Sequence, residues 1–263
     1  MEKKRIGIIG GGISGAALGY YLSLYEEADI TIFEKNRIGC GTTAKSAGTV
    51  CLFDDSLSNR YWDVRLYGFE TYCRFEREEK GSAGFDQTGT LVVALSEQEE
   101  LRIKAGIALA KAAGYSGEYI TDKSRIEEIL PGINTENVLG AGYTRDDGYF
   151  DGTMISNTFV KKMQTNGGIV KTDMEVTEII RKGDAAVGLK TADGTRYDFD
   201  TIVDCTGPVS YTHLDVYKRQ VLSRPRTTSP ASSFSSPAIW TPGLWGPPTM
   251  PPEMPLPWNW PAF

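Results

Sequence analysis

Three glycines near the start of the chain have the spacing of a turn that binds a dinucleotide. They follow a short β-rich run, residues 5–9, and precede a segment with helical periodicity; the motif is Gly10-x-Gly12-x-x-Gly15. In such a turn the first glycine permits the tight bend, the second lets a pyrophosphate approach the backbone, and the third lets the helix lie close to the strand. The orphan amide groups of Ile13 and Ser14, at the positive end of the helix dipole, are expected to bind the phosphates.

An acidic residue follows at the distance that this chemistry requires. Glu34 ends a second β-rich run, residues 29–33, and stands nineteen residues after Gly15. Its carboxylate is expected to accept hydrogen bonds from the adenosine ribose hydroxyls and to disfavour the 2′-phosphate of NADP. Lys35, the next residue, belongs to the same predicted site. Because strand, glycine turn, helix, strand and acid occur in order, the sequence predicts a Rossmann-like α/β fold.

The choice between NAD and FAD depends on two later segments. The loop at residues 39–48 offers hydroxyl donors and ends in residues small enough for a flat ring to lie against the backbone. A β-rich run over residues 201–204 is followed by Thr206 and Gly207. The candidates in the loop are Thr42, Thr43, Ser46, Ala47 and Gly48.

Together these segments resemble the FAD-dependent D-amino acid oxidase superfamily, which includes glycine oxidase, sarcosine oxidase and dehydrogenase, and dimethylglycine dehydrogenase. The resemblance covers the N-terminal portion of such an enzyme, residues 4–208. In that family a small-residue loop ending in Ala-Gly runs beneath the flavin, and an element like Asp147-Gly-Tyr-Phe-Asp151 precedes a helix. A residue at the position of Val176 holds the adenine through its backbone, and the final strand ends near the cofactor, which is the reason that Thr206 and Gly207 are candidates. The resemblance therefore implies FAD.

Two residues depart from the family pattern. Cys205 replaces the alanine of an Ala-Thr-Gly-like element, and we expect it to be a packed residue at a strand end rather than a reactive thiol. Lys45 stands where relatives that attach flavin covalently have a histidine. The resemblance therefore implies noncovalent FAD.

The predicted organisation is an α/β, Rossmann-like FAD-binding domain with an incomplete antiparallel-sheet substrate domain. The FAD-binding domain comprises residues 1–50 and 146–208, and the start of the substrate domain comprises residues 51–145. Helices are expected over residues 57–79, 96–113 and 123–130, and a strand over residues 89–95. Asp151 is expected to cap a helix over residues 152–164. The runs 169–171, 175–181 and 185–191 are predicted to form a β-meander that leads to the final strand.

The end of the chain has a different composition. Residues 221–263 hold most of the 13 prolines and all but one of the 5 tryptophans. The hypothesis that we favour for residues 209–263 is an artefact, a translated adaptor at 209–220 followed by reading in a wrong frame. As a genuine segment they would form a proline-rich disordered tail.

Composition restricts the possible partners and compartment. The net charge of −6 and the pI near 5.0 argue against nucleic acid as the main partner. The four cysteines are scattered and His213 is the single histidine, so we predict neither a metal site nor a disulfide framework. No apolar run approaches the ~20 residues that span a bilayer. We expect a cytoplasmic protein without a transmembrane segment.

The leading functional hypothesis is oxidation of the CH–NH bond of a small amino acid or N-methyl amino acid, by hydride transfer to flavin. Oxygen or an electron carrier would then accept the electrons, and the chain as given would be a truncated and inactive portion. Because the flavin carries out the difficult step, no catalytic side chain is assigned. In the family arginine or tyrosine side chains hold the substrate carboxylate; the candidates here are Arg60, Arg65, Tyr67 and Arg145, each expected to be structural or solvated instead.

Three alternatives remain open from the sequence. An FAD-dependent 2-hydroxy acid or glycerol phosphate dehydrogenase would share the N-terminal motifs, and substrate-dependent reduction of the flavin separates it from an amine oxidase. An NAD-dependent dehydrogenase would give a colourless protein that binds NADH. A nonenzymatic FAD-binding fragment would be yellow, with no substrate able to bleach it.

Overall fold

The computed structural model describes residues 3–52 and 61–207. The predicted tail, His213 and the candidate Arg60 lie outside the described residues. Within the described residues, no helix combines the length and the apolar character needed to cross a membrane.

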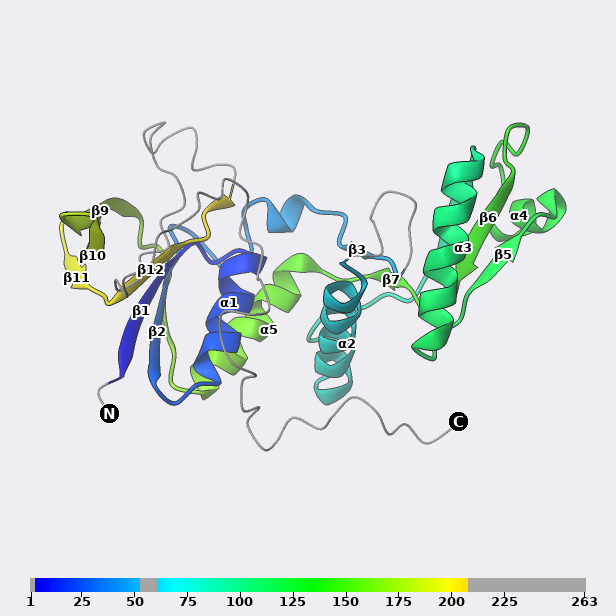
Figure 1. Cartoon of the computed structure of the whole chain (residues 1–263). Coiled ribbons are helices and arrows are strands. Elements are labelled where there is room, and N and C mark those ends of the chain that lie inside the picture. Colours follow the sequence, from blue (N-terminus) through cyan, green and yellow to red (C-terminus); the bar gives the residue numbers. More distant parts are fainter. Residues whose placement is uncertain (1–2, 53–60, 208–263) are drawn as a thin grey trace, which may run out of the picture. The chain divides into compact units, whose positions relative to one another are not determined.

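A four-stranded parallel sheet carries the glycine motif. Its strands are β1 (Lys4–Ile9), β2 (Ala28–Phe33), β8 (Ile169–Lys171) and β12 (Thr201–Asp204), and their spatial order is β12-β1-β2-β8 (Figure 1). The helices α1 (Ile13–Ser23) and α5 (Gly152–Thr165) link successive strands and pack side by side. In open parallel sheets of this kind, ligands bind beyond the carboxyl ends of the strands.

Alternation along the strands builds a core on each face of the sheet. Ile8 of β1 and Ile32 of β2 pack in one cluster with Tyr20 of α1 and Phe159 of α5. Residues of opposite parity, such as Ile9, pack in a second cluster against the other face. Both faces are therefore buried, as a parallel sheet requires.

The second face is covered by an antiparallel meander. It comprises β9 (Val176–Lys182), β10 (Ala185–Thr191) and β11 (Arg196–Asp198), in the order β11-β10-β9. A Cβ atom at Gly7 of β1 would lie 2.8 Å from the ring of Phe199, which follows the meander. The absent side chain of Gly7 thus lets Phe199 lie directly on the sheet.

A second group of elements lies in the sequence between β2 and β8, two strands of the parallel sheet. It contains α2 (Trp62–Glu78) and a three-stranded antiparallel sheet of order β4-β6-β5, with β4 (Thr90–Ala94), β5 (Glu118–Ile120) and β6 (Gly140–Thr144). Helix α3 (Glu97–Ala112) packs with Val92, whereas α4 (Lys123–Ile129) packs with Leu91 and Val93. Alternate residues of β4 thus serve opposite faces of this sheet.

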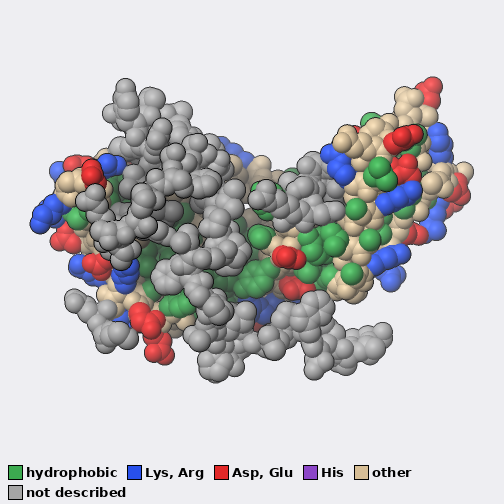
Figure 2. Space-filling model, viewed as in Figure 1, with side chains coloured by type: hydrophobic (Ala, Val, Ile, Leu, Met, Phe, Trp, Pro, Cys, Tyr) green, Lys and Arg blue, Asp and Glu red, His purple; other side chains and the backbone are tan. Residues whose placement is uncertain are grey.

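The outer surfaces of these helices are solvated and carry both signs of charge. Figure 2 shows Lys, Arg, Asp and Glu side chains interspersed over this part of the chain. On α3, Lys104 Nζ lies 2.6 Å from Glu100, and on α4 Arg125 lies 2.6 Å from Glu118. Such exposed pairs contribute little to stability, so the buried clusters hold the elements together.

The fold class is confirmed, and several local predictions agree with the structure. Helices occur at 62–78, 97–112 and 123–129, and β10 has the predicted bounds. Asp151 caps α5: its Oδ1 accepts hydrogen bonds from the amides of Thr153 and Met154, both at 2.8 Å. The predicted start of α3 is also correct, because Ser96 Oγ accepts from the Glu99 amide.

One prediction was wrong. The run 169–171 does not belong to the meander; as β8 it pairs parallel to β2 at the edge of the main sheet. The physical reason is the crossover helix α5, which returns the chain to the same end of the sheet and so produces a parallel strand.

The cap of α5 gives a first testable prediction. Asp151→Ala removes the acceptor of two orphan amides and should lower the free energy of unfolding by about 1 kcal/mol. Asp151→Asn keeps a good cap and should retain most of the stability. Denaturant unfolding of both variants measures the difference; equal losses in the two variants would contradict the capping role.

Candidate functional site

The turn after β1 is shaped by a close approach of the last strand. Gly10 has a φ of 102°, a conformation that favours glycine. A Cβ atom there would lie 2.7 Å from the carbonyl oxygen of Cys205 and 3.0 Å from the amide nitrogen of Thr206. The predicted first and last segments of the site therefore meet at this turn.

The other two motif glycines have different surroundings. A Cβ at Gly15 would lie 1.9 Å from the carbonyl oxygen of Gly10, so α1 can approach the turn only with glycine there. Among the described residues, a Cβ at Gly12 would meet one atom within 4 Å, Thr43 Oγ1 at 3.2 Å. The space beside Gly12 is thus open to a ligand, as close approach of a diphosphate requires.

Glu34 is held beside the turn by two backbone amides. The Gly11 amide donates to Oε2 at 2.7 Å, and the Asn36 amide donates to Oε1 at 2.9 Å. The side chain is half-buried, while its neighbour Lys35 is exposed. The carboxylate is therefore oriented by the protein itself and retains lone pairs for ribose hydroxyls.

Thr43 connects the second predicted segment to the start of α1. The Ile13 amide donates to Thr43 Oγ1 at 3.1 Å, which satisfies one of the orphan amides of the helix. Gly12, the N-cap residue, has no side chain for this task. Because Thr43 Oγ1 accepts this bond, its hydroxyl proton remains for another acceptor, while the exposed Ser14 lies one residue further along α1.

The small-residue loop is fixed at its far end by the Asp-Gly element. Gly48 has a φ of 67°, and a Cβ there would lie 2.0 Å from the carbonyl oxygen of Phe150. The Phe150 amide donates to the Gly48 carbonyl at 3.0 Å. Strand β3 (Thr49–Val50) then pairs with β7 (Gly148–Tyr149). Within the loop, Thr42, Ser46 and Ala47 are exposed.

The last strand and the meander complete the surroundings of the turn. The Cys205 amide donates to the Ile9 carbonyl at 2.8 Å, and the Thr206 hydroxyl donates to Asp204 Oδ1 at 2.5 Å. Burial, with a smaller effect of Asp204, raises the pKa of the Cys205 thiol to about 11, which fits a packed residue rather than a nucleophile. The exposed Gly207 follows.

A backbone hydrogen bond near Val176 joins the start of β9 to Glu34. The Met174 amide donates to the Glu34 carbonyl at 2.9 Å, two residues before β9 begins at Val176. Val176 is half-buried against the second core cluster. The structure thus brings the glycine turn, Glu34, Thr43, the end of β12 and the start of β9 to one edge of the sheet.

Sequence reasoning missed two residues of this region. Gly11 supplies the amide that orients Glu34, and its Cβ would lie 2.4 Å from Ile38. The run of three consecutive glycines was the available signal. Asp147 was noted only as part of a motif, yet its side chain is fully buried and both carboxylate oxygens lie 3.1 Å from the Leu52 amide nitrogen.

Three of the four candidates for the substrate carboxylate, Arg65, Tyr67 and Arg145, lie among the described residues. Arg145 is exposed, and Tyr67, also exposed, lies against the ring of Tyr21 at 5.9 Å between centroids. Arg65 is half-buried, and its positive charge acts to lower the pKa of the Asp147 carboxyl group. Among the described residues, no group of three or more His, Cys, Asp or Glu side chains could hold a metal ion.

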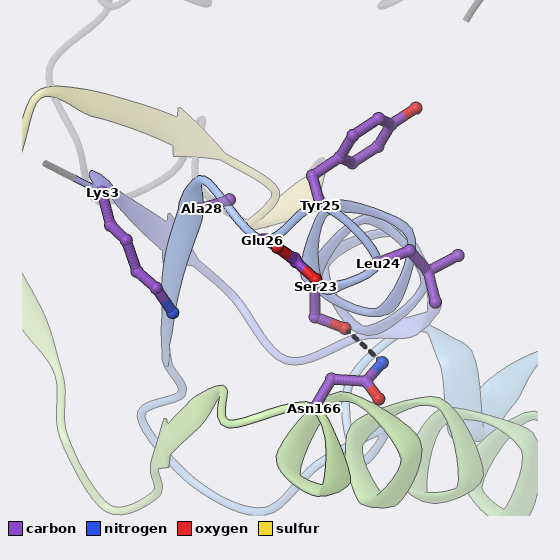
Figure 3. Close-up of a pocket in the computed structure, with 7 residues that line it drawn as sticks. All are labelled: Lys3, Ser23, Leu24, Tyr25, Glu26, Ala28 and Asn166. Atoms are coloured by element: carbon purple, nitrogen blue, oxygen red, sulfur yellow. Dashed lines mark hydrogen bonds between the residues drawn. The ribbon is translucent and has the colours of Figure 1, made fainter. Parts of the chain in front are cut away.

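A cavity of about 480 Å³ lies elsewhere (Figure 3). It is bounded by residues around the end of α1 and the starts of β1 and β2, where Asn166 Nδ2 donates to Ser23 Oγ at 3.1 Å. Ligands of open parallel sheets bind at the opposite edge, beyond the carboxyl ends of the strands. This cavity is therefore not the dinucleotide site.

Comparison with known proteins places the chain among flavoproteins. A family model described as FAD dependent oxidoreductase matches residues 5–256. The 4-methylaminobutanoate oxidase (formaldehyde-forming) of Paenarthrobacter nicotinovorans is 27% identical over 198 residues, which make up 75% of this chain and 24% of that protein. The mitochondrial pyruvate dehydrogenase phosphatase regulatory subunit of Mus musculus is 24% identical over 218 residues, 83% of this chain and 24% of that protein.

Solved structures share the fold. The glycine oxidase of Bacillus cereus aligns with a TM-score of 0.61 at 21% identity, covering 81% of this chain and 57% of that one. The chain spans about a quarter of the length of the two curated relatives, the 4-methylaminobutanoate oxidase and the phosphatase regulatory subunit.

The contrast between Gly12 and Gly15 gives a second prediction. Gly12→Ala places a methyl group in the open space beside the helix start, so it should change stability by less than about 1 kcal/mol but weaken FAD binding at least about tenfold. Gly15→Ala forces a methyl group onto a backbone oxygen and should cost about 3 kcal/mol or more of stability. Denaturant unfolding and FAD titration measure the two effects; unchanged FAD affinity in a folded Gly12→Ala variant would contradict the site.

Proposed function

The chain belongs to the FAD dependent oxidoreductase family, and from that premise we propose that it binds FAD noncovalently and oxidises the CH–NH bond of a small amino acid or N-methyl amino acid. Family membership confirms the resemblance drawn over residues 4–208. The observation that carries the cofactor assignment is the open space beside Gly12 next to an oriented Glu34 carboxylate.

The residues present fit the adenosine diphosphate part of FAD. Ile13 and Ser14 offer amides at the start of α1, Thr43 offers its hydroxyl proton, and Glu34 offers acceptors for the ribose. A carboxylate at this position disfavours the extra phosphate of NADP. Val176 stands at the start of β9, where its backbone would contact the adenine.

The loop ending in Gly48 fits the ring system. Its exposed Ser46 and Ala47 leave a surface of small side chains, and Gly48 holds this surface against Phe150. Lys45, exposed in the short helix η1 (Thr43–Lys45), cannot attach to flavin as a histidine does, which supports noncovalent binding. When bound, FAD supplies the two-electron acceptor; the protein binds and orients the substrate and excludes water.

The substrate class is supported by a relative. The 4-methylaminobutanoate oxidase acts, by its name, on an N-methylated amino acid. No described side chain need act as base for a neutral amine, because the flavin accepts the hydride. The activity of the whole protein, including its electron acceptor, belongs to this proposal.

One observation favours a second candidate. A relative of similar identity is named as a regulatory subunit rather than as an oxidase or dehydrogenase. The chain could therefore be an FAD-binding module without its own oxidation reaction. The two candidates share the cofactor and differ in whether any amine reduces it.

The cofactor proposal is tested by the visible absorption of the purified 263-residue chain, before and after FAD is added. We expect flavin bands that remain with the protein on gel filtration and leave with the supernatant after denaturation. Glu34→Ala should weaken FAD binding at least about tenfold, while the matched control Asp29→Ala, at an exposed position of β2, should not. A colourless protein that binds NADH would overturn the proposal.

The reaction is tested by anaerobic addition of substrates to the FAD-loaded chain. Bleaching of the flavin bands by sarcosine or 4-methylaminobutanoate, but not by lactate or glycerol 3-phosphate, is the expected result. Bleaching by the hydroxy compounds alone would contradict the CH–NH assignment. A yellow chain that none of these compounds reduces would favour the nonenzymatic module.

A further inference from the structure

Asp147 joins three segments that are far apart in the sequence. Both oxygens of its side chain lie 3.1 Å from the Leu52 amide nitrogen, and its carbonyl oxygen accepts from the Gly89 amide at 2.9 Å. Thr90, the first residue of β4, also hydrogen-bonds the carboxyl group through its side chain. Asp147 and Leu52 have no exposed surface. One buried carboxyl group thus ties the segment that follows β3 to the start of β4.

A short two-stranded ribbon, formed by β3 and β7, leads from Leu52 back to the loop that fits the flavin ring. The two strands pair at two positions. A two-stranded ribbon is marginal on its own in water, and a slip of its register by one residue would move the loop by about 3.3 Å. The hydrogen bond from Leu52 to Asp147 lies just beyond the paired residues. It therefore opposes such a slip.

The other end of the ribbon carries the loop itself. The Gly48 amide donates to Ser46 Oγ at 3.2 Å, and the Gly48 carbonyl accepts from the Phe150 amide at 3.0 Å. A Cβ at Gly48 would lie 2.0 Å from the carbonyl oxygen of Phe150, so the loop follows this backbone closely. The place of Ser46 and Gly48 is therefore set by the register of β3 against β7.

Resting on the proposed FAD binding, we propose that Asp147 is a positioning residue for the flavin ring: it holds Leu52 and, through the ribbon, holds residues 46–48 where the ring binds. This role needs an acceptor for the Leu52 amide and a hydrogen-bond partner for the Thr90 hydroxyl. An ionised carboxylate, a neutral carboxyl group and the side-chain amide of asparagine each supply both. The role is therefore one of hydrogen bonding and shape, and it is independent of the charge of Asp147.

The adenosine diphosphate end of the site is built from other contacts. The Gly11 amide orients Glu34, and the Ile13 amide bonds Thr43; Asp147 is part of neither bond. Loss of its carboxyl group should therefore loosen the ring end of the site and leave the diphosphate end intact. ADP lacks the isoalloxazine ring, so its affinity reports on the diphosphate end alone. The ratio of the FAD affinity to the ADP affinity then reports on the ring end.

The test is calorimetric titration of the full 263-residue chain with FAD and, separately, with ADP. In Asp147→Ala the FAD affinity should fall at least about tenfold, while the ADP affinity changes by less than about twofold. Asp147→Asn should restore most of the FAD affinity, because its amide oxygen accepts from Leu52. Asp122→Ala is the matched control: it removes the cap of α4 and lowers stability, and both affinities should stay as in the wild type.

A second variant decides the question where Asp147→Ala does not fold. Thr90→Val removes one partner of the carboxyl group and suits a strand, so it should lower the FAD affinity about threefold and leave the ADP affinity unchanged. Equal falls for FAD and ADP, or an unchanged FAD affinity in the folded variants, would overturn the inference and leave the cofactor assignment intact. The same holds if a folded Asp147→Asn binds FAD as weakly as Asp147→Ala. Absence of FAD binding by the wild type would overturn the proposed function and this inference together.

Discussion

The close contact between the turn after β1 and the end of β12 is the constraint on which the site depends. Gly10 lies against the Cys205 carbonyl, and Gly15 lies against the Gly10 carbonyl, each at a distance that excludes a side chain. These two contacts fix where α1 starts relative to the sheet. The direction of the helix amides, and hence the place where a diphosphate can bind, follows from backbone packing and not from any charged side chain.

The sequence predicts this part of the fold well because its determinants are local. The glycine spacing, the alternation of β1 and β2 and the acid at Glu34 all lie within one strand–helix–strand unit. Asp151 and Ser96 were likewise predictable as caps, since a cap and its helix are neighbours in the chain. The proximity of the glycine turn to Glu34 and to the end of β12 could be predicted, whereas FAD binding by these residues stays a prediction.

The rest depends on partners that are distant in sequence. The short strands β5 and β6 were not predicted, because Glu118–Ile120 has three residues and Gly140–Thr144 has two glycines, which weaken any strand pattern. They become strands because β6 pairs with β4 on one side and with β5 on the other. Likewise, nothing within Ile169–Lys171 distinguishes a parallel edge strand from a meander strand; the crossover through α5 decides.

Asp147 depends both on a local sequence motif and on contacts with residues that are distant in the sequence. Its motif was visible in the sequence, but its burial arises from contacts with Leu52 and Thr90, which lie 95 and 57 residues away along the chain. A buried carboxylate is costly, and an apolar residue of similar size would avoid that cost but would leave the Leu52 amide without its acceptor. The glycine turn is shaped by backbone contacts, whereas the segment that follows Gly48 is held by the buried carboxylate of Asp147.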